Sequence, residues 1–283
     1  MTPEPPTALV LERIVRVALE EDIARGDITT DSTIAPEAEG RAAFRARGPL
    51  VLSGLPVIET VFRLIDGAVQ VTPRASDGDR LEAGDVAAEL RGPARSMLLG
   101  ERVALNFAQR MSGVATLARS YVDALPAGSN CRVTDTRKTT PGLRALERYA
   151  VRCGGAHNHR EDLSSAVLIK DNHIAAAGGV RRAIEAARAR APHTSRIECE
   201  VDTFEQLDEA LAAGAEIIML DNFDDEAVRR AVAHVAKRAI LEASGSITRA
   251  RVRALAEAGV DVISVGALTH SAPAADLGLD WLT

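Results

Sequence analysis

The sequence predicts an α/β fold: an N-terminal α+β sandwich domain followed by an incomplete α/β barrel of six to seven strands. From residue 130 onward, six apolar runs alternate with amphipathic helical segments, which indicates a parallel sheet with right-handed crossovers. Nearly every run ends in a polar residue or glycine. Polar residues gathered at one end of all the strands favour a barrel with its site at that end over a doubly wound sheet.

Composition and charge narrow the class of protein. The 283 residues carry a formal net charge of −6, which argues against a general nucleic-acid-binding protein. The sequence has no apolar run of about 18 residues and no secretory signal, so we expect no membrane association. Its cysteines show neither a metal spacing nor a paired framework, as is typical of a reducing compartment. We therefore expect a cytoplasmic protein.

The N-terminal half mixes helices with short strands. Apolar spacing and turn residues predict helices at 8–22 and 55–65 and strands within 40–53 and 69–90. The longest helical pattern spans 95–125, and Ser112-Gly113 is expected to interrupt it. We place a domain boundary at this dipeptide, with the α+β domain at residues 1–112 and the barrel domain at residues 113–268.

In the second half, strands and helices alternate regularly. The strand candidates are 131–135, 166–170, 196–201, 216–221, 239–243 and 260–265, and the helix candidates are 141–151, 175–190, 203–213, 224–236 and 248–258. Thr203, Asp224 and Thr248 are expected to cap three of these helices, because their side-chain oxygens can accept hydrogen bonds from free N–H groups of the first turn.

Cationic side chains follow the first two strands of this half. Arg137 and Lys138 come after one strand and Lys170 ends the next, while His159 and Arg160 lie in the connection between them. Several cations directed toward one place predict a pocket for a polyanionic small molecule. Lys170 permits two chemistries, because a desolvated lysine forms a Schiff base and a charged one binds a carboxylate or phosphate.

Carboxylates end two of the later strands. Glu200 and Asp221 predict a magnesium site, acceptors for sugar hydroxyls, or an acid and a base. Structural ion pairs with Lys170 or Arg137 are the alternative. Glu198 is expected to point the other way by strand alternation, which makes it a weaker candidate.

Glycine-containing turns end the last two strands. Ser244-Gly245-Ser246 and Val265-Gly266-Ala267 predict a phosphate seat, because backbone N–H groups at a helix N-terminus attract anions. A plain tight turn is the alternative for the first triplet.

Ten short motifs are distributed along nearly the whole chain. They are Glu21-Asp-Ile23, Gly26-Asp-Ile-Thr-Thr30, Gly100-Glu-Arg102, Asp135-Thr-Arg-Lys-Thr-Thr-Pro-Gly142, Asn158-His-Arg160, Ile169-Lys-Asp-Asn-His173, Glu198-Cys-Glu-Val201, Met219-Leu-Asp-Asn222, Glu242-Ala-Ser-Gly245 and Val265-Gly-Ala-Leu-Thr-His270. In this order they resemble the quinolinate phosphoribosyltransferase family. The resemblance implies an α/β N-terminal domain, an incomplete barrel, and a C-terminal tail at residues 269–283 that returns to the first domain.

The resemblance also implies a reaction. A phosphoribosyl group would pass from 5-phosphoribosyl 1-diphosphate to quinolinate with decarboxylation, giving nicotinate mononucleotide, CO2 and diphosphate in NAD biosynthesis. Mg2+ would accompany the diphosphate substrate, held by Glu200 and Asp221, with no organic cofactor and no covalent nucleophile.

Residue roles follow from the same resemblance. The implied catalytic residues are Lys138, Lys170, Glu200 and Asp221. The implied substrate-binding residues are Arg102, Thr136, Arg137, Lys138, His159, Arg160, Lys170, Glu200, Asp221, Ser244, Gly245, Ser246, Val265, Gly266 and Ala267. From the residues alone, Arg102 is interpreted as a solvated surface charge. The resemblance instead places it in the active site of the partner subunit, which requires a homodimer or a higher homo-oligomer.

The chain departs from the family pattern beside the cationic segment. Glu161-Asp162 and Ser164-Ser165 stand where relatives often have other residues, and Ser246 replaces a usual glycine. Negative charge near a carboxylate pocket leaves open a phosphoribosyltransferase for a different acidic base. A Schiff-base aldolase that uses Lys170 and a non-catalytic anion-binding relative are the other two hypotheses.

Overall fold

The computed structural model describes residues 3–282, and the chain divides into two compact units. The first unit holds Met1–Arg119, Thr139–Gly155 and Ala267–Thr283, and the second holds Ser120–Lys138 and Ala156–Gly266. The units are thus interleaved along the chain, and the domain boundaries expected at residues 112 and 268 stay predictions.

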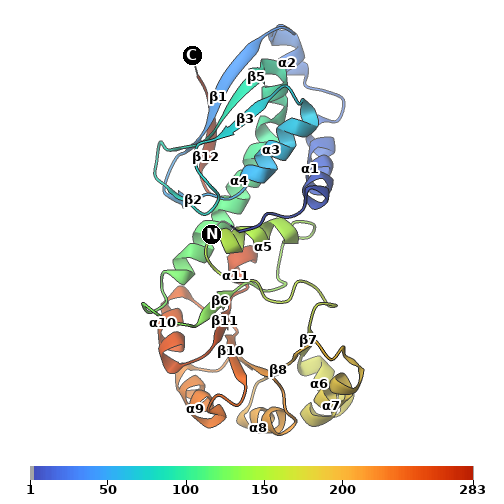
Figure 1. Cartoon of the computed structure of the whole chain (residues 1–283), viewed down its shortest axis with the longest axis vertical. Helices are drawn as coiled ribbons and strands as arrows, with labels where there is room; N and C mark the ends of the chain where they lie inside the picture. Colours follow the sequence, from blue (N-terminus) through green and yellow to red (C-terminus); the bar gives the residue numbers. More distant parts are fainter. Residues whose placement is uncertain (1–2, 283) are drawn as a thin grey trace. The chain divides into compact units, whose positions relative to one another are not determined.

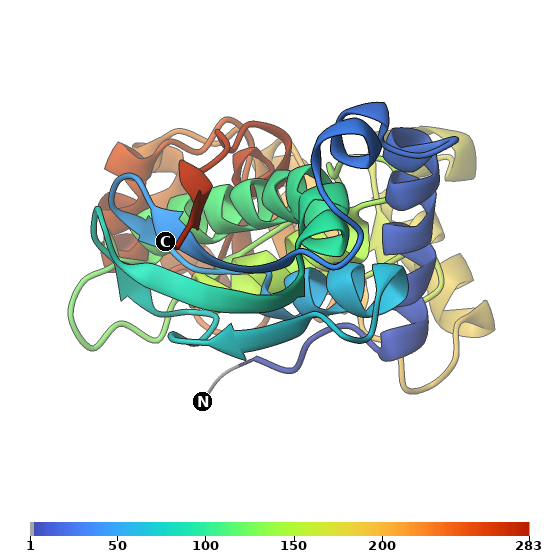
Figure 2. The same cartoon turned by 90° about the horizontal axis from the view of Figure 1, so that it is seen from above.

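An antiparallel sheet forms the framework of the first unit. Its strand order is β12 (Leu277–Trp281), β1 (Glu39–Ala46), β5 (Val86–Pro93) and β3 (Gln70–Pro73). Phe44 of β1 is fully buried, and its ring lies 6.4 Å from that of Phe62 in α3 (Leu55–Ile65). The α3 helix packs against β3, and α1 (Ala8–Ile23) packs against α3 (Figure 1). Figure 2 shows the helices of this unit gathered beside its strands.

Residues near the two ends of the chain share this sheet. β12 pairs antiparallel with β1, with Ala42 opposite Trp281 and Ala46 opposite Leu277. The remaining elements of the first unit are α2 (Ile28–Thr33), β2 (Leu50–Val51), β4 (Arg80–Leu81), α5 (Arg144–Cys153) and α11 (Ala267–His270).

The long helix α4 runs from Ala94 to Val122 without a break. The interruption expected at Ser112-Gly113 is therefore wrong. Both residues serve close packing instead, because a side chain at Gly113 would overlap the backbone carbonyl of Pro273. Ser112 Oγ donates to Ser53 O (3.1 Å) and accepts from Ser53 N (3.0 Å), which ties α4 to a segment far away in the sequence.

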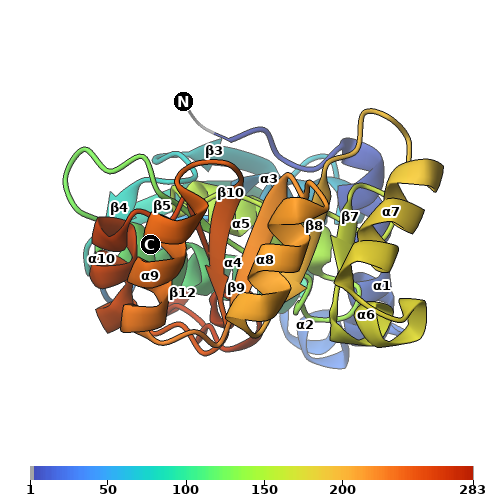
Figure 3. The ribbon, with the colours of Figure 1, turned by 90° about the horizontal axis from the view of Figure 1, so that it is seen from below.

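Parallel strands form the sheet of the second unit. Their order is β6 (Arg132–Thr134), β11 (Val262–Ser264), β10 (Ile240–Ser244), β9 (Ile217–Asp221), β8 (Ile197–Val201) and β7 (Val167–Ile169). The helices that follow these strands lie side by side over the sheet (Figure 3): α7 (Val180–Arg190), α8 (Phe204–Ala212), α9 (Asp225–Val235) and α10 (Arg249–Ala258). Within residues 3–282, β6 and β7 are the two edge strands of this sheet. The predicted α/β class, with an incomplete barrel of six strands, is confirmed.

The predicted helix starts are largely confirmed. Thr203 accepts from Gln206 N (3.2 Å) and Asp224 accepts from Ala227 N (2.8 Å), whereas Thr248 occupies its cap position without a side-chain hydrogen bond. The single helix expected at 175–190 is wrong. Two helices, α6 (Asp171–Ala177) and α7, stand there, because Gly178 adopts a left-handed conformation (φ 80°) that ends α6.

The described helices were compared with the length and hydropathy that a membrane span requires. None of those in the described part of the chain is both long and apolar enough to cross a bilayer.

Replacing Gly113 with alanine tests the close approach of Pro273 to α4. Alanine favours helix, yet its methyl group would displace the Pro273 backbone, so we expect Gly113→Ala to lower the free energy of unfolding by about 1–3 kcal/mol. Denaturant unfolding followed by circular dichroism measures this. Gly48→Ala is the control, because a methyl group at Gly48 meets no atom within 4 Å. Equal effects of the two changes would contradict the packing role of Gly113.

Candidate active site

The C-terminal ends of the parallel strands lie along one edge of the second sheet. Ser244 at the end of β10 is level with Asp221 at the end of β9. Lys170 follows β7 directly, and Glu200 lies one residue before the end of β8. Strands that run in the same direction thus deliver polar residues from distant parts of the sequence to the same place.

A lysine–carboxylate constellation occupies this edge. Lys170 Nζ donates to Glu200 Oε2, and the two side chains are 44% and 12% exposed. Burial and the nearby Asp202 carboxylate raise the pKa of Asp221, while the ammonium groups of Lys170 and Lys138 oppose that rise. The structure therefore brings together the predicted catalytic residues Lys138, Lys170, Glu200 and Asp221.

Two arginines of the second unit, Arg137 and Arg160, influence each other electrostatically. Burial lowers the pKa of Arg160, and the positive charge of Arg137 lowers it further. Arg160 Nη1 donates to Ala166 O (2.9 Å), which holds the guanidinium near the start of β7. Thr136 Oγ1 accepts from Lys138 N (3.1 Å) and shapes the turn that carries Arg137. Like charges held together in this way favour an anion that neutralises both.

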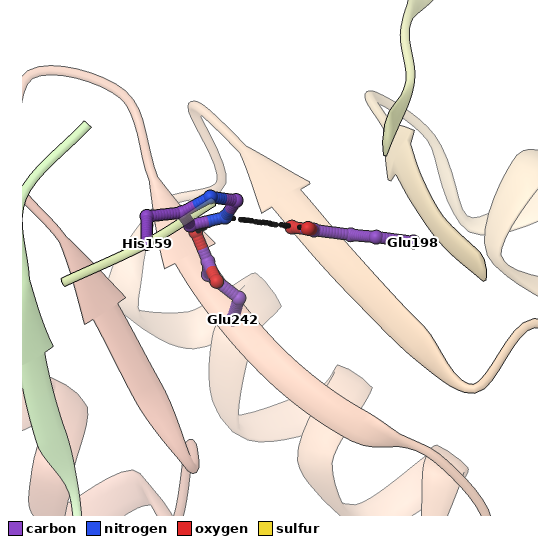
Figure 4. Close-up of side chains that lie close together, drawn as sticks. All are labelled: His159, Glu198 and Glu242. Carbon is purple, nitrogen blue, oxygen red and sulfur yellow. Dashed lines mark hydrogen bonds and ion pairs between the residues drawn. The ribbon is translucent and has the colours of Figure 1, made fainter. Parts of the chain in front are cut away.

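His159 turns its ring toward two buried carboxylates, as Figure 4 shows. Its Nε2 lies 3.3 Å from Glu198 Oε2 and 3.5 Å from Glu242 Oε1, and the two glutamates are only 4% and 3% exposed. Burial alone would lower the pKa of His159, but the neighbouring Glu198 and Glu242 carboxylates outweigh it and raise the pKa to about 10. Burial also raises the pKa of Glu198.

A backbone contact opposes a doubly protonated His159 ring, although the two carboxylates favour one. Arg160 N donates to His159 Nδ1 (2.7 Å), so Nδ1 is an acceptor and the ring proton is on Nε2. A ring protonated on both nitrogens could not accept this bond.

The same proton positions bear on metal binding. His159, Glu198 and Glu242 bring their ligand atoms within 4.8 Å of one another, a grouping that could hold a metal ion. A metal on Nε2 would require the ring proton on Nδ1, where it would face the Arg160 N–H, so the arrangement disfavours an ion there. Glu200 and Asp221 instead offer carboxylate oxygens on neighbouring strands, the donors that Mg2+ prefers.

The turn after β10 has the backbone of an anion seat. Gly245 and Ser246 both have positive φ angles (86° and 49°), as does Asn222 (58°) in the turn after β9. Asn222 N donates to Ser244 O (3.1 Å), and a side chain at Gly245 would overlap Asn222. Asn222, Gly245 and Ser246 line a hollow of about 720 Å³ that also borders Arg251.

Four predicted site residues remain less defined. Val265 N donates to Thr134 O (2.9 Å), which places the turn at Gly266 beside the end of β6. Arg102 is exposed on α4, and Ala267 begins α11. Both belong to the first unit, whereas the other candidates belong to the second. The substrate-binding roles of all four stay predictions.

Sequence reasoning missed the buried carboxylates around His159. Glu198 was expected to point the other way from Glu200, which is wrong, because residues two apart on a strand point to the same face. Glu242 and Asp135 lie within motifs that were noted, yet neither was singled out. The available signal was a charged residue inside an otherwise apolar run, which a buried strand seldom tolerates.

A parallel α/β sheet with clustered cations, paired carboxylates and a glycine turn at its strand ends is typical of enzymes that bind phosphorylated substrates. Comparison with known families identifies which one. The family model described as quinolinate phosphoribosyl transferase, N-terminal domain, matches residues 27–112, and its C-terminal domain matches residues 114–280. The chain belongs to the quinolinate phosphoribosyl transferase family.

Individual relatives agree along almost the full length. The chain is 44% identical over 272 residues to a probable nicotinate-nucleotide pyrophosphorylase (carboxylating) of Bacillus subtilis, covering 96% of this chain and 93% of the relative. It is 39% identical to the human nicotinate-nucleotide pyrophosphorylase (carboxylating), covering 96% and 93%. The solved nicotinate-nucleotide pyrophosphorylase of Francisella tularensis superposes with a TM-score of 0.93 at 39% identity, covering 99% and 100%.

Replacing Gly245 with alanine tests the anion-seat backbone. The methyl group would both strain a positive φ and overlap Asn222, so we expect a loss of about 2–4 kcal/mol in the free energy of unfolding. Gly214→Ala is the matched control, because Gly214 also has a positive φ (76°) but faces only a flexible arginine at 3.6 Å. It should cost about 1–2 kcal/mol. Indistinguishable costs in denaturant unfolding would show that the Asn222 contact is unimportant.

Proposed function

We propose that this protein transfers the phosphoribosyl group of 5-phosphoribosyl 1-diphosphate to quinolinate, with release of CO2 and diphosphate and formation of nicotinate mononucleotide. Membership of the family and the activity named for the relatives support the proposal. The single observation that carries it is the group of charged side chains at the strand ends, Lys138, Lys170, Glu200 and Asp221. Its cations suit a dicarboxylate and a diphosphate held together, and its carboxylates suit a ribose and a metal ion.

The dicarboxylate is assigned to the arginine pair. The positive charge of Arg137 acts on Arg160, and a planar guanidinium binds a carboxylate through two parallel N–H bonds. Quinolinate carries two adjacent carboxylates, so one molecule can neutralise both arginines. Lys170 is paired with Glu200 in this structure, and a bound carboxylate would compete with Glu200 for the ammonium group.

The phosphoribosyl donor is assigned to the carboxylate side of the same edge. The 5′-phosphate would lie against the N–H groups of Gly245 and Ser246, and the ribose hydroxyls would donate to Glu200 and Asp221. The two carboxylates fit Mg2+ as oxygen ligands, and Mg2+ bound there with the donor would neutralise charge on the departing diphosphate.

The chemistry then needs no covalent nucleophile. The pyridine nitrogen forms a bond to ribose C1 as the bond to diphosphate breaks, and carboxylates near the ribose stabilise the cationic transition state. The alkylated nitrogen is positively charged, so the electron pair left on the adjacent ring carbon when CO2 departs is stabilised until that carbon takes a proton. Lys138 and Lys170 hold positive charge beside the diphosphate and carboxylates throughout.

The assembly is part of the proposal. Arg102 is exposed on α4 in the first unit, and we propose that it completes the site of the partner subunit in a homodimer or higher homo-oligomer. An exposed cation there would add charge to a pocket for two anions.

The residues that depart from the family pattern form a turn of their own. Asp162 accepts from Ser164 N (2.8 Å) and Ser164 Oγ (2.7 Å), while Ser165 Oγ accepts from Glu161 N (3.0 Å). These hydrogen bonds to Ser164 lower the pKa of Asp162. The Asp162 carboxylate is thus held by its own loop, so the departure from the family pattern is compatible with quinolinate as the base.

Turnover with quinolinate is the direct test. Purified protein with quinolinate, 5-phosphoribosyl 1-diphosphate and Mg2+ should form nicotinate mononucleotide and CO2 in equal amounts, measured by chromatography and by release of labelled CO2. Omitting Mg2+ by adding a chelator should abolish turnover. Diphosphate release only with other acidic pyridines would overturn quinolinate as the substrate while keeping phosphoribosyl transfer.

Removing the Lys170 ammonium group tests its charged role. Lys170→Ala should lower kcat/KM for quinolinate by about 100-fold or more, as expected for the loss of a preorganised cation at the reacting groups. Lys237→Ala is the control, because Lys237 is an exposed lysine paired with Asp261, and it should retain wild-type activity. Borohydride should not attach substrate to Lys170. Covalent trapping there would instead support the Schiff-base hypothesis.

A further inference from the structure

The base pocket is the place at Arg137 and Arg160 to which the dicarboxylate is assigned. We infer that three carboxylates are positioning residues of this pocket, namely Asp135, Glu198 and Glu242. They hold His159, and through it Arg160, in place without touching the substrate. The inference rests on the proposed function, because it assigns Arg160 to the dicarboxylate. It concerns three carboxylates that the proposed reaction itself does not use.

Asp135 fixes the backbone of this segment. It is fully buried at the end of β6, and its Oδ1 accepts from His159 N (2.8 Å) while its Oδ2 accepts from Asn158 Nδ2 (2.7 Å). Asp135 N donates in turn to His157 O (3.1 Å). The chain from His157 to His159 is therefore attached to β6 by both backbone and side-chain hydrogen bonds.

Glu198 and Glu242 fix the ring from the other side. They belong to β8 and β10, which flank β9 in the sheet. Met219 of β9 is level with both Glu200 and Glu242, so Glu198, two residues before Glu200, points to the same face as Glu242. His159 Nε2 faces both carboxylates at 3.3–3.5 Å (Figure 4). A rotation of the ring would lose both contacts.

The orientation of the His159 ring in turn fixes the backbone of Arg160. With Nε2 directed at the carboxylates, Nδ1 is turned to accept from Arg160 N (2.7 Å). That bond fixes the peptide from which the Arg160 side chain departs, and Ala166 O holds the guanidinium at 2.9 Å. A carboxylate ligand bound through two N–H groups is sensitive to such orientation, since a misplacement of about 1 Å can cost on the order of 100-fold in rate.

Stability alone does not account for the carboxylate pair. Burying carboxylates is costly, and replacing buried ionic groups with apolar ones of similar volume is often neutral or stabilising. The contacts at 3.3–3.5 Å are longer than strong hydrogen bonds, and Glu242 Oε1 has no hydrogen-bond partner although it is buried. Hydrogen-bond strength therefore does not explain why two carboxylates are buried here, whereas their geometry orients one ring.

The first experiment compares carboxylate-to-amide changes. Glu198→Gln and Glu242→Gln should each raise KM for quinolinate by roughly 10- to 100-fold, while KM for 5-phosphoribosyl 1-diphosphate changes by less than about twofold. Asp77→Asn is the matched control: Asp77 is buried in the first unit, where it accepts from Gly54 N (2.9 Å) and Tyr149 OH (2.7 Å). It should lower the Tm without changing either KM.

A double-mutant cycle tests whether the glutamates act through His159. If they do, Glu242→Gln should have little further effect on KM for quinolinate in a His159→Asn background, because the ring it orients is gone. Full additivity of the two changes would overturn the inference. So would a lower Tm in the glutamine variants with KM for quinolinate unchanged.

Two further measurements separate the remaining outcomes. Metal analysis of the wild-type protein should find no ion that disappears in Glu242→Gln. An ion lost in this way would make the cluster a metal site and overturn the positioning role.

Wild-type turnover with quinolinate is measured first, so that its absence counts against the proposed function. Binding of quinolinate by calorimetry then tests positioning independently, and unchanged affinity in both glutamine variants would overturn it.

Discussion

The arrangement of the second unit depends on one constraint, which is that charged groups removed from water need partners. Parallel strands carry cations and carboxylates to a single edge, where burial reduces the contact of Glu200 and Asp221 with water. Lys170 pairs with Glu200, and Arg160 donates to the Ala166 carbonyl. Each of these partners is one that an anionic substrate can replace or supplement. The protein's own groups therefore orient these cations, so that a bound anion does not have to order them.

The fold could be predicted from the sequence wherever a residue's local preference agrees with its surroundings in the folded protein. Strand runs followed by polar residues and capped helix starts identified the parallel sheet, and Thr203 and Asp224 cap helices as their chemistry requires. The prediction failed where a residue served tertiary packing. Gly113 looks like a helix breaker in isolation, but its missing side chain makes room for the Pro273 backbone within a continuous helix. No local pattern encodes that contact.

The site was predictable to a similar extent. Residues at strand ends, such as Lys170 and Asp221, could be identified because parallel topology brings strand ends together whatever the register. Glu198 and Glu242 could not be identified in this way, because their meeting at His159 depends on the alignment of β8 and β10 across an intervening strand. A loop residue, His159, then had to reach both of them. The strand register and the path of the loop that carries His159 are set by the tertiary structure. A sequence motif predicts neither of them.

The charge balance of the base pocket comes from two sources of different rigidity. The first source is Asp162 in the loop, whose negative charge favours the protonated form of Arg160. Its carboxylate is held by hydrogen bonds within its own exposed turn. The other source is the sheet interior, where Asp135, Glu198 and Glu242 are almost completely buried. A buried carboxylate on a strand keeps its position far better than one in an exposed loop. Substitutions in the loop should therefore tune the strength with which Arg160 binds a carboxylate, whereas the direction in which it points is set by the sheet.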